Sequence, residues 1–309
     1  MRAIFFGTPE FAVPSLEALN DIAEVVAVVC QPDRAVGRGL ELTAPPVKKR
    51  ALELGLAVHQ PTKVRVPEFA EWLKSLNADV ALVVAYGRIL TKAVLESPRL
   101  GCVNVHGSIL PKYRGAAPVQ WSVIDGERET GVTFMKMDEG MDTGDMLTKH
   151  VIAIGEDDTS GDMAKRLSEV ARDCVREDLP RFVKGELTPQ KQDDSQATEA
   201  RLLEKTDGNV PWTKGAELVQ SHVRGMSPWP GAYTKRAGKT LKIHKVRVFE
   251  KSGKNEVPGK VLVADKSRVI VACGEGSVEL VTIQPEGKKQ LAATEVVSGR
   301  GLVEGDVLG

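Results

Sequence analysis

The residues best suited to chemistry lie at the end of one apolar segment and in a later loop. We expect residues 100–106 to form a β-strand, in which side chains two positions apart point the same way. Asn104 and His106 therefore aim at one spot, and Gly107 then opens a loop rich in serine and proline. A carboxylate, Asp142, follows in the run Met-Asp-Thr-Gly. An amide donor beside an imidazole, with a carboxylate to orient the ring, suits the tetrahedral intermediate of acyl transfer.

An Asn-x-His spacing often arises by chance, so this interpretation depends on the elements that would hold the two residues. Apolar runs with the length of strands alternate with helical patterns in the first half of the chain; the strands are expected at 2–6, 24–30, 79–85 and 101–106, and helices at 46–54, 67–76 and 115–124. Unbroken apolar strands separated by helices predict an α/β fold with a doubly wound, mostly parallel sheet. Ligands of such sheets bind beyond the carboxyl ends of the strands, where Gly7 and His106 stand.

The second half has a different pattern. A long amphipathic helix is expected over 159–184, and a polar segment interrupted by Pro189 and Pro211 follows it. From Ala232 onward, short strands separated by glycines predict a small β-barrel. We therefore expect three parts, which are a catalytic domain over 1–187, a linker over 188–206 and a C-terminal barrel domain over 207–309.

Charge is balanced over the 309 residues but uneven along them. The chain has 42 Lys/Arg and 42 Asp/Glu. Residues 205–309 hold 17 basic and 11 acidic residues, a net charge of +6, so residues 1–204 carry −6. This asymmetry favours a nucleic acid or another phosphate-bearing partner for the second half, with chance fluctuation as the alternative.

Several classes of site lack their motifs. The four cysteines are scattered without zinc-ligand spacing, so we expect no metal. The start of the chain lacks the later glycines of a dinucleotide-binding loop, and no P-loop occurs. No apolar run approaches 18 residues, and the first strand is too short for a signal peptide. We expect a cytoplasmic protein that does not bind membranes.

Two basic segments are candidates for an RNA-binding surface. Residues 31–39 are rich in glycine and arginine and form either an ordinary surface loop or a basic finger that follows a phosphate backbone. Residues 235–254 hold eight Lys/Arg and one acid, Glu250, on what is either a solvated or an RNA-binding face. We favour RNA binding through both segments, by Arg34, Arg38, Lys235, Arg236, Lys242 and Lys245.

These motifs together resemble those of the methionyl-tRNA formyltransferase family over nearly the whole length. The matching segments are 6–12, 31–39, 85–87, 101–108, 110–118, 131–133, 141–146 and 228–233. The Asn-x-His pair with its downstream aspartate resembles all enzymes that move a formyl group from 10-formyltetrahydrofolate. The Gln-Pro-Asp-Arg loop at 31–34, the Arg-Gly-Ala-Ala-Pro run at 114–118 and the second domain are more specific to the tRNA enzymes.

The resemblance implies a Rossmann-like formyl-folate transferase domain followed by an OB-type barrel. It implies transfer of a formyl group from the cosubstrate 10-formyltetrahydrofolate to the α-amino group of initiator methionyl-tRNA, for translation initiation, without a metal or an obligatory protein partner. Asn104, His106 and Asp142 match the catalytic trio. Arg38 matches a basic residue of the loop that reaches the tRNA acceptor end. Two segments match folate-contacting positions, namely Ser108, Ile109, Leu110 and Pro111, and then Arg88, Ile89 and Leu90.

The chain departs from the family pattern in two places. Val210-Pro211-Trp212 stands where Ile-Asp-Trp is common, and Leu202 stands where a basic residue is expected, so the linker's contacts with tRNA are not specified. Two other functions remain open. A formyltransferase for a small amine, such as glycinamide ribonucleotide or an amino sugar nucleotide, would not need the basic segments. A non-enzymatic RNA-binding protein with this fold would not need His106.

Overall fold

The chain folds into two units, seen here in a computed structural model that describes residues 1–36, 41–299 and 301–309. The first unit comprises Met1–Pro118, Thr130–Ile152 and Ala164–Arg201, and the second comprises Val119–Glu129, Ala153–Met163 and Leu202–Gly309. Within the described residues, no helix is both long and apolar enough to cross a membrane.

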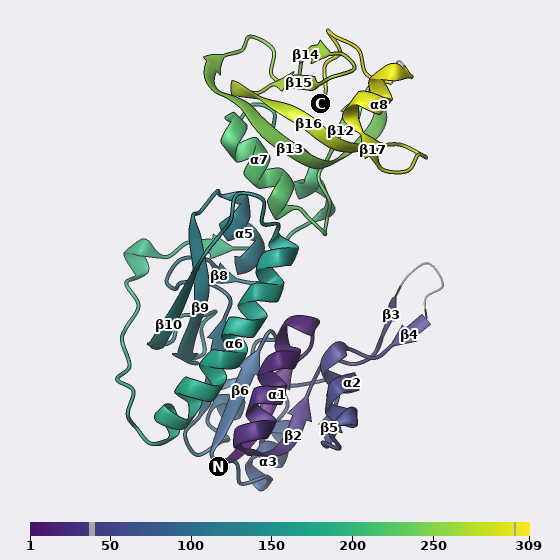
Figure 1. The fold of residues 1–309 in the computed structure, drawn as a ribbon. Coiled ribbons are helices and arrows are strands. Elements are labelled where there is room, and N and C mark those ends of the chain that lie inside the picture. Colours follow the sequence, from purple (N-terminus) through teal and green to yellow (C-terminus); the bar gives the residue numbers. More distant parts are fainter. Residues whose placement is uncertain (37–40, 300) are drawn as a thin grey trace. The chain divides into compact units, whose positions relative to one another are not determined.

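The first unit is built on a seven-stranded sheet with the order β10-β9-β7-β6-β1-β2-β5 (Figure 1). The strands are β1 (Arg2–Gly7), β2 (Glu24–Val29), β5 (Val58–His59), β6 (Val80–Val84), β7 (Cys102–His106), β9 (Glu129–Lys136) and β10 (Met146–Ala153). The pairs from β7 to β5 are parallel, whereas β9 runs antiparallel to β7. The mostly parallel sheet predicted from the apolar runs is therefore confirmed.

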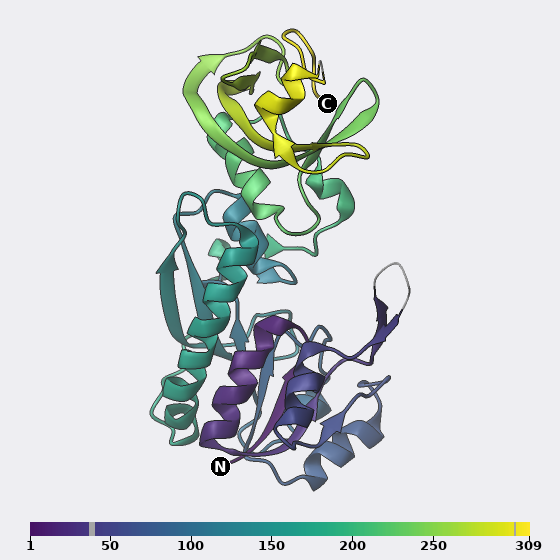
Figure 2. The same ribbon diagram turned by 45° about the vertical axis from the view of Figure 1, so that its right-hand side comes forward.

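Helices cover both faces of this sheet. They are α1 (Val13–Ile22), α2 (Pro46–Glu53), α3 (Pro67–Ser75), α4 (Lys92–Leu95) and α6 (Ser160–Val183). Side chains alternate along β1, and Phe6 packs edge-on against Phe69 of α3 and against Tyr86. Figures 1 and 2 show α1 and α6 side by side, and an ion pair of 2.6 Å joins Arg176 to Asp21 between them. Because both faces are covered, the strands are apolar throughout.

The central strand β1 marks the point where the order of connection reverses. The chain runs from β1 outward through β2 to β5, then crosses back to β6 on the other side of β1. The loops after β1 and β6 therefore diverge, and open α/β sheets bind ligands in the crevice formed there.

The elements after β1 and β7 differ in detail from the expected pattern. After β1, a 3-10 turn (η1, Glu10–Ala12) precedes α1, which has Pro14 in its first turn. The helix expected from Gly115, α5 (Pro118–Ile124), begins three residues later, and Arg114–Gly115 forms the short strand β8. Residues 31–39 were expected to form a surface loop or basic finger, and part of them forms the unpredicted strand β3 (Arg34–Val36), which pairs antiparallel with β4 (Glu41–Thr43).

The second unit is organised around an antiparallel sheet with the order β12-β13-β16-β15-β14, and β17 pairs with β16. Its main elements are α7 (Ala216–Gly225), β12 (Tyr233–Arg236), β13 (Lys239–Lys254), β14 (Val261–Ala264), β15 (Val269–Ala272), β16 (Glu275–Pro285), β17 (Leu291–Ala292) and α8 (Ala293–Ser298); the short η3 (Lys205–Gly208) precedes them. The strongly curved sheet is visible in Figure 2. Leu241, Ile243 and Val246 of β13 are buried, and a register shift between Ile243 and Lys245 keeps them on one face.

The last residues of the chain join the two edges of this sheet. The backbone N–H of Gly309 donates to the carbonyl of Lys235 on β12, at 3.0 Å. On the β14 side, Val261 N–H donates to Asp306 and Leu308 N–H donates to Gly259, at 2.8 and 2.9 Å. The tail therefore bridges the first and last strands and completes the barrel-like enclosure of the core.

Candidate active site

Strand β7 places two polar side chains at the carboxyl end of the sheet. It pairs with β6 on one side and β9 on the other, so its backbone is hydrogen-bonded on both edges. Asn104 and His106 occupy alternate positions and are only 8% and 6% exposed. Buried polar side chains require partners, because an unpaired one costs about 1–3 kcal/mol. Their partners define the site.

The ring of His106 is held by a backbone group that the sequence did not reveal. Its Nε2 lies 2.8 Å from the carbonyl oxygen of Tyr113. A carbonyl oxygen can only accept, so Nε2 carries a proton and Nδ1 is the edge left for other chemistry. Nδ1 lies 3.5 Å from Oδ2 of Asp142.

The carboxylate of Asp142 is anchored independently of the imidazole. Its Oδ2 accepts from the backbone N–H of Gly115 at 2.9 Å, and its Oδ1 lies 3.4 Å from Nδ2 of Asn104. The bond to Gly115 is short, whereas the contacts to Asn104 and His106 are long. The amide of Asn104 and the imidazole of His106 therefore make only weak contacts with the carboxylate. Catalytic hydrogen bonds are often long in the free enzyme and shorten when substrate binds. The structure brings together the three residues predicted to act as a trio.

The loop before β10 holds Asp142 in place by its own contacts. Thr143 Oγ1 and Gly140 N–H both donate to Asp138 Oδ1, at 2.7 and 3.1 Å. A Cβ on Gly144 would lie 1.9 Å from the carbonyl oxygen of Lys136, so this position requires glycine. Asp142 itself has a φ of 55°, a left-handed conformation that residues other than glycine adopt rarely.

The predicted folate segment Ser108–Pro111 packs mainly beneath the site. Ser108 Oγ donates to the carbonyl of Lys112 at 2.7 Å, and its own carbonyl accepts from Thr133 Oγ1 at 2.7 Å. Leu110 is fully buried in a cluster with Met135 and Met146. Ile109 and Pro111 remain partly accessible. The side chains of Ser108 and Leu110 therefore pack against the protein interior. A ligand can contact this segment through its backbone or through the side chains of Ile109 and Pro111.

In the second predicted folate segment, Arg88 is hydrogen-bonded within the protein, Leu90 is buried and Ile89 is exposed. Arg88 donates to Gln31 Oε1 and to the carbonyl of Thr62, at 2.9 and 2.8 Å. Leu90 is 3% exposed and belongs to the core, whereas Ile89 is 50% exposed.

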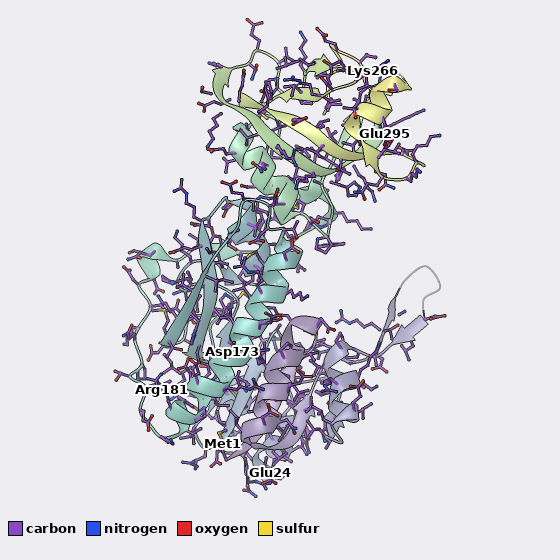
Figure 3. All side chains as sticks on the ribbon, viewed as in Figure 1. Met1, Glu24, Asp173, Arg181, Lys266 and Glu295 are labelled. Carbon is purple, nitrogen blue, oxygen red and sulfur yellow. The ribbon has the colours of Figure 1, made fainter. Side chains whose placement is uncertain are left out.

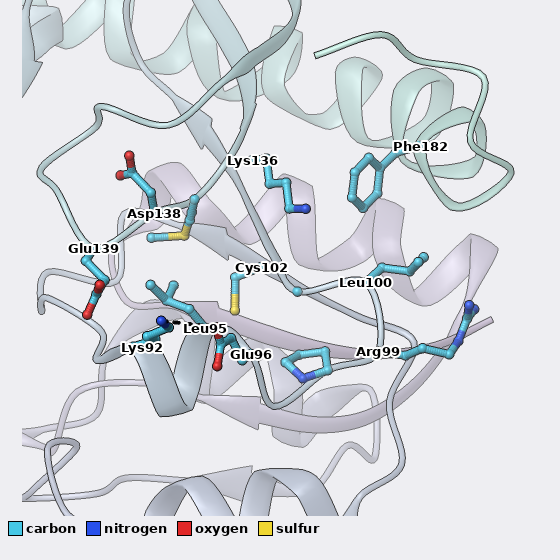
Figure 4. Close-up of a pocket in the computed structure, with 13 residues that line it drawn as sticks. Lys92, Leu95, Glu96, Arg99, Leu100, Cys102, Lys136, Asp138, Glu139 and Phe182 are labelled. Carbon is cyan, nitrogen blue, oxygen red and sulfur yellow. Dashed lines mark ion pairs between the residues drawn. The ribbon is translucent and has the colours of Figure 1, made fainter. Parts of the chain in front are cut away.

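A cavity of about 610 Å³ opens beside β7 (Figure 4). Leu95 of α4, Cys102 of β7 and Met137 after β9 form part of its wall, and six charged side chains line the rest, namely Lys92, Glu96, Arg99, Lys136, Asp138 and Glu139. Cys102 begins β7 and His106 ends it, so the cavity lies at the amino end of the strand, away from the end that carries the trio. Asn104, His106 and Asp142 do not line it. Because ligands of such sheets bind at the carboxyl ends of the strands, this cavity is not the candidate substrate site.

A second cavity of about 390 Å³ lies at the ends of β1 and β6, in the crevice where the strand order reverses. Thr8, Gln31 and Tyr86 line it, and so do prolines and Arg34 of the β3–β4 hairpin. Thr8 Oγ1 and Gln31 Nε2 both donate to the carbonyl of Tyr86, each at 3.2 Å, which joins the loops after β1, β2 and β6.

The predicted tRNA-binding side chains have different surroundings. Arg34, Lys235 and Lys242 are exposed. Arg236 forms an ion pair with Asp306 at 2.6 Å, and Lys245 forms one with Asp157 at 3.0 Å. Arg38 lies outside the described residues.

Among the described residues, one group has side chains close enough to hold a metal ion. Ligand atoms of His150, Cys174 and Asp178 lie within 4.8 Å of one another. The Asp178 carboxylate already accepts from Thr148 Oγ1 at 2.6 Å and from His150 Nε2 at 2.7 Å, and Arg181 pairs with it at 3.0 Å (Figure 3 labels Arg181). Burial raises the pKa of the Cys174 thiol well above its usual value, which disfavours the thiolate that a metal needs. The group is therefore a hydrogen-bonded network that ties α6 to β10.

Comparison with known proteins decides the family. Residues 1–178 match the formyl transferase family and residues 202–301 match its C-terminal domain. The chain is 56% identical to the methionyl-tRNA formyltransferase of Sorangium cellulosum (strain So ce56) over 310 aligned positions, covering 100% of both chains. It is 47% identical to that of Citrifermentans bemidjiense, covering 100% of this chain and 96% of the relative. The chain belongs to the methionyl-tRNA formyltransferase family. Family membership and formyl transfer to methionyl-tRNA, both expected from the sequence, are thereby confirmed.

Solved structures of the wider fold are more distant in sequence. The sugar 3N-formyl transferase WlaRD is 16% identical with a TM-score of 0.68, covering 94% of this chain and 99% of its own. The methionyl-tRNA formyltransferase from Clostridium thermocellum is 17% identical with a TM-score of 0.54, covering 80% and 93%. At these identities the likeness establishes the fold, with a Rossmann-like sheet followed by an antiparallel C-terminal domain.

Proposed function

We propose that the Asn104–His106–Asp142 site transfers the formyl group of 10-formyltetrahydrofolate to the α-amino group of initiator methionyl-tRNA by direct attack. The observation that carries this proposal is the convergence of an amide, an imidazole edge and an anchored carboxylate from separate segments. Family membership names the donor and acceptor, and the site supplies the chemistry. Four free, buried cysteines support action in the cytoplasm, a reducing compartment.

The roles of the three residues follow from their contacts. The neutral amine attacks the formyl carbon, a C–N bond forms, and the carbonyl oxygen gains negative charge. Asn104 Nδ2 and a protonated Nδ1 of His106 are the donors for that oxygen, since Nε2 is occupied by the Tyr113 carbonyl. Asp142 stabilises the charged ring and accepts the amine proton, directly or through water. The bond from the formyl carbon to the folate nitrogen then breaks, and that nitrogen takes up a proton.

We propose that the donor binds at the carboxyl end of the parallel strands, where Ser108–Pro111 follows β7 and Arg88–Leu90 follows β6. In these two segments Ile109 and Pro111 are partly accessible and Ile89 is 50% exposed, so a ligand can reach them. Ligands of open α/β sheets bind at this end. A donor held there has its formyl group near Asn104 and His106.

We propose that the methionyl end of the acceptor approaches along the cavity at the ends of β1 and β6. Its lining is mostly apolar, with Thr8, Gln31, Arg34 and Thr43 as polar members, which suits an unbranched thioether side chain. The β3–β4 hairpin borders this cavity with the exposed Arg34. A cation there supports contact with phosphates of the acceptor strand.

A transfer assay tests the proposal. The protein is incubated with 10-formyltetrahydrofolate and one of three amines: methionylated initiator tRNA, glycinamide ribonucleotide or a dTDP-linked amino sugar. We expect formylation of the charged tRNA alone, and a loss of about 10²–10³-fold in rate for Asn104→Ala. Formylation of a small amine in preference to the tRNA would overturn the acceptor assignment. Full tRNA binding without transfer would support the non-enzymatic alternative.

A further inference from the structure

The polar segment before the second unit is bonded to the active site. Residues 190–200, here called the strap, lie within the first unit. Gln190 exchanges two backbone hydrogen bonds of 2.8 Å with Met146 at the start of β10. At its other end, strand β11 (Glu199–Ala200) pairs in parallel with β8. The strap is therefore fixed at both ends, beside the loop that carries Asp142.

The strap holds the segment that binds His106 and Asp142. Thr198 Oγ1 accepts from the N–H of Tyr113, and the Thr198 carbonyl accepts from the N–H of Arg114, both at 2.8 Å. A Cβ on Gly115 would lie 2.7 Å from the Ala200 carbonyl oxygen, and Gly115 has a φ of 125°. The two backbone groups that touch the trio, Tyr113 C=O and Gly115 N–H, thus belong to a segment pressed against the strap.

One side chain of the strap reaches the catalytic loop directly. Gln192 Nε2 donates to the carbonyls of Asp142 and Gly144, at 2.7 and 2.8 Å. Its Oε1 accepts from Nε of Arg114 at 3.0 Å, and Arg114 also pairs with Asp194 at 2.7 Å. The amide nitrogen of Gln192 thus has two carbonyl acceptors and its oxygen has one N–H donor, which fixes the orientation of the amide. Gln192 therefore joins both backbone segments that position the carboxylate.

We propose that Gln192 is a positioning residue for the formyl transfer, acting by holding Asp142 at its place beside His106 and Asn104. Asp142 stands in a left-handed conformation, so its loop needs support from outside. Gln192 bonds to the backbone on both sides of Thr143 and restrains the rotation that would swing the carboxylate away. This inference rests on the proposed function for its catalytic meaning, whereas the restraint itself concerns the free protein.

The test uses two substitutions with different chemistry. In Gln192→Glu, the carboxylate still accepts from Arg114 but cannot donate to the carbonyls of Asp142 and Gly144. Gln192→Ala removes both contacts. The matched control is Gln190→Glu, because Gln190 is exposed and bonds to Met146 through its backbone. All variants are full-length and are compared for kcat, for KM of both substrates and for hydrogen exchange of residues 138–144.

We expect kcat to fall about 10–100-fold in Gln192→Glu and Gln192→Ala, because a displacement on the order of 1 Å costs up to about 100-fold. KM values should stay within about twofold, exchange in 138–144 should rise, and Gln190→Glu should match the unsubstituted protein. Unchanged kcat and exchange in Gln192→Glu would overturn the inference while leaving the function intact. If the unsubstituted protein formylates none of the amines, the proposed function fails, and the exchange comparison still decides whether Gln192 restrains the loop.

Discussion

His106 and Asp142 face each other only through the Nδ1 edge of the imidazole, because Nε2 donates to the Tyr113 carbonyl at 2.8 Å. The tautomer is thus set by a backbone group seven residues further along the chain. In a neutral ring with its proton on Nε2, the lone pair of Nδ1 faces the carboxylate, and the two repel each other. A hydrogen bond between His106 and Asp142 therefore needs a proton on Nδ1 or on the carboxylate. A proton shared along this axis fits the proposed mechanism, in which Asp142 stabilises the charged ring and accepts the amine proton.

Asn104→Ala should remove one of the two donors to the developing oxyanion. We expect kcat to fall by about 10²–10³ while the fold is kept, since the amide makes only a 3.4 Å contact with Asp142 in the free protein. Steady-state formylation measures the rate, and circular dichroism with thermal melting checks the fold. Near-normal turnover by a folded variant would refute the role.

Gly144→Ala should displace Asp142 without touching any reacting group. The added Cβ would meet the Lys136 carbonyl oxygen at 1.9 Å, so the loop has to move. We expect kcat to fall about 100-fold, because misplacement of a catalytic group on the order of 1 Å has such an effect. The control is Gly299→Ala, whose nearest atom is 3.8 Å away, and it should behave like the unsubstituted protein. Equal activities of both variants would contradict the account of the loop.

Lys242→Ala should weaken tRNA binding and reduce its salt dependence. Lys242 is exposed on β13 and lies opposite Tyr233 of β12 in the antiparallel ladder. Removing one phosphate contact lowers the slope of log affinity against log salt by about 0.7–0.9. The control is Lys266→Ala, which is exposed after β14 at the opposite edge of the sheet (labelled in Figure 3). Binding titrations at several salt concentrations measure both slopes, and equal losses would argue against a face centred on β12 and β13.

His222 should make the stability of the second unit fall in mild acid. Burial lowers the pKa of this imidazole from 6.5 to about 4, against the opposing effects of Asp207 and the backbone at Gly208 and Asn209. Between these values the unfolded chain binds the proton and the folded chain does not, so stability is lost as pH falls from 6.5 toward 4. The loss at pH 5 relative to neutral pH is about 2 kcal/mol.

Urea unfolding at pH 7 and pH 5 checks this prediction. His222→Leu should lack this part of the acid loss, whatever its stability at pH 7, whereas the control His244→Asn, at an exposed position, should follow the unsubstituted protein. An NMR titration of His222 gives the answer directly if the leucine variant does not fold. An imidazole that titrates near 6.5 would contradict the prediction.

The sequence alone determined the local features of this protein. The apolar runs fixed β1, β2, β6 and β7, because a strand buried on both faces has to be apolar throughout. The spacing of Asn104 and His106 put them on one face, since strand periodicity is two. The motif resemblance identified Asp142 and the family, because side chains that perform one reaction recur with the same local sequence.

Only the tertiary structure decided how distant segments meet. Tyr113, Gly115 and Gln192 act through backbone groups or through contacts across tens of residues, and no local pattern encodes such contacts. The cavity at the ends of β1 and β6 depends on the order of strands in the sheet. Residues 190–200 were expected to belong to a linker because they are polar, yet in the structure they form the strap of the first unit. Their hydrogen-bonding groups are satisfied by segments that come close only when the sheet has formed.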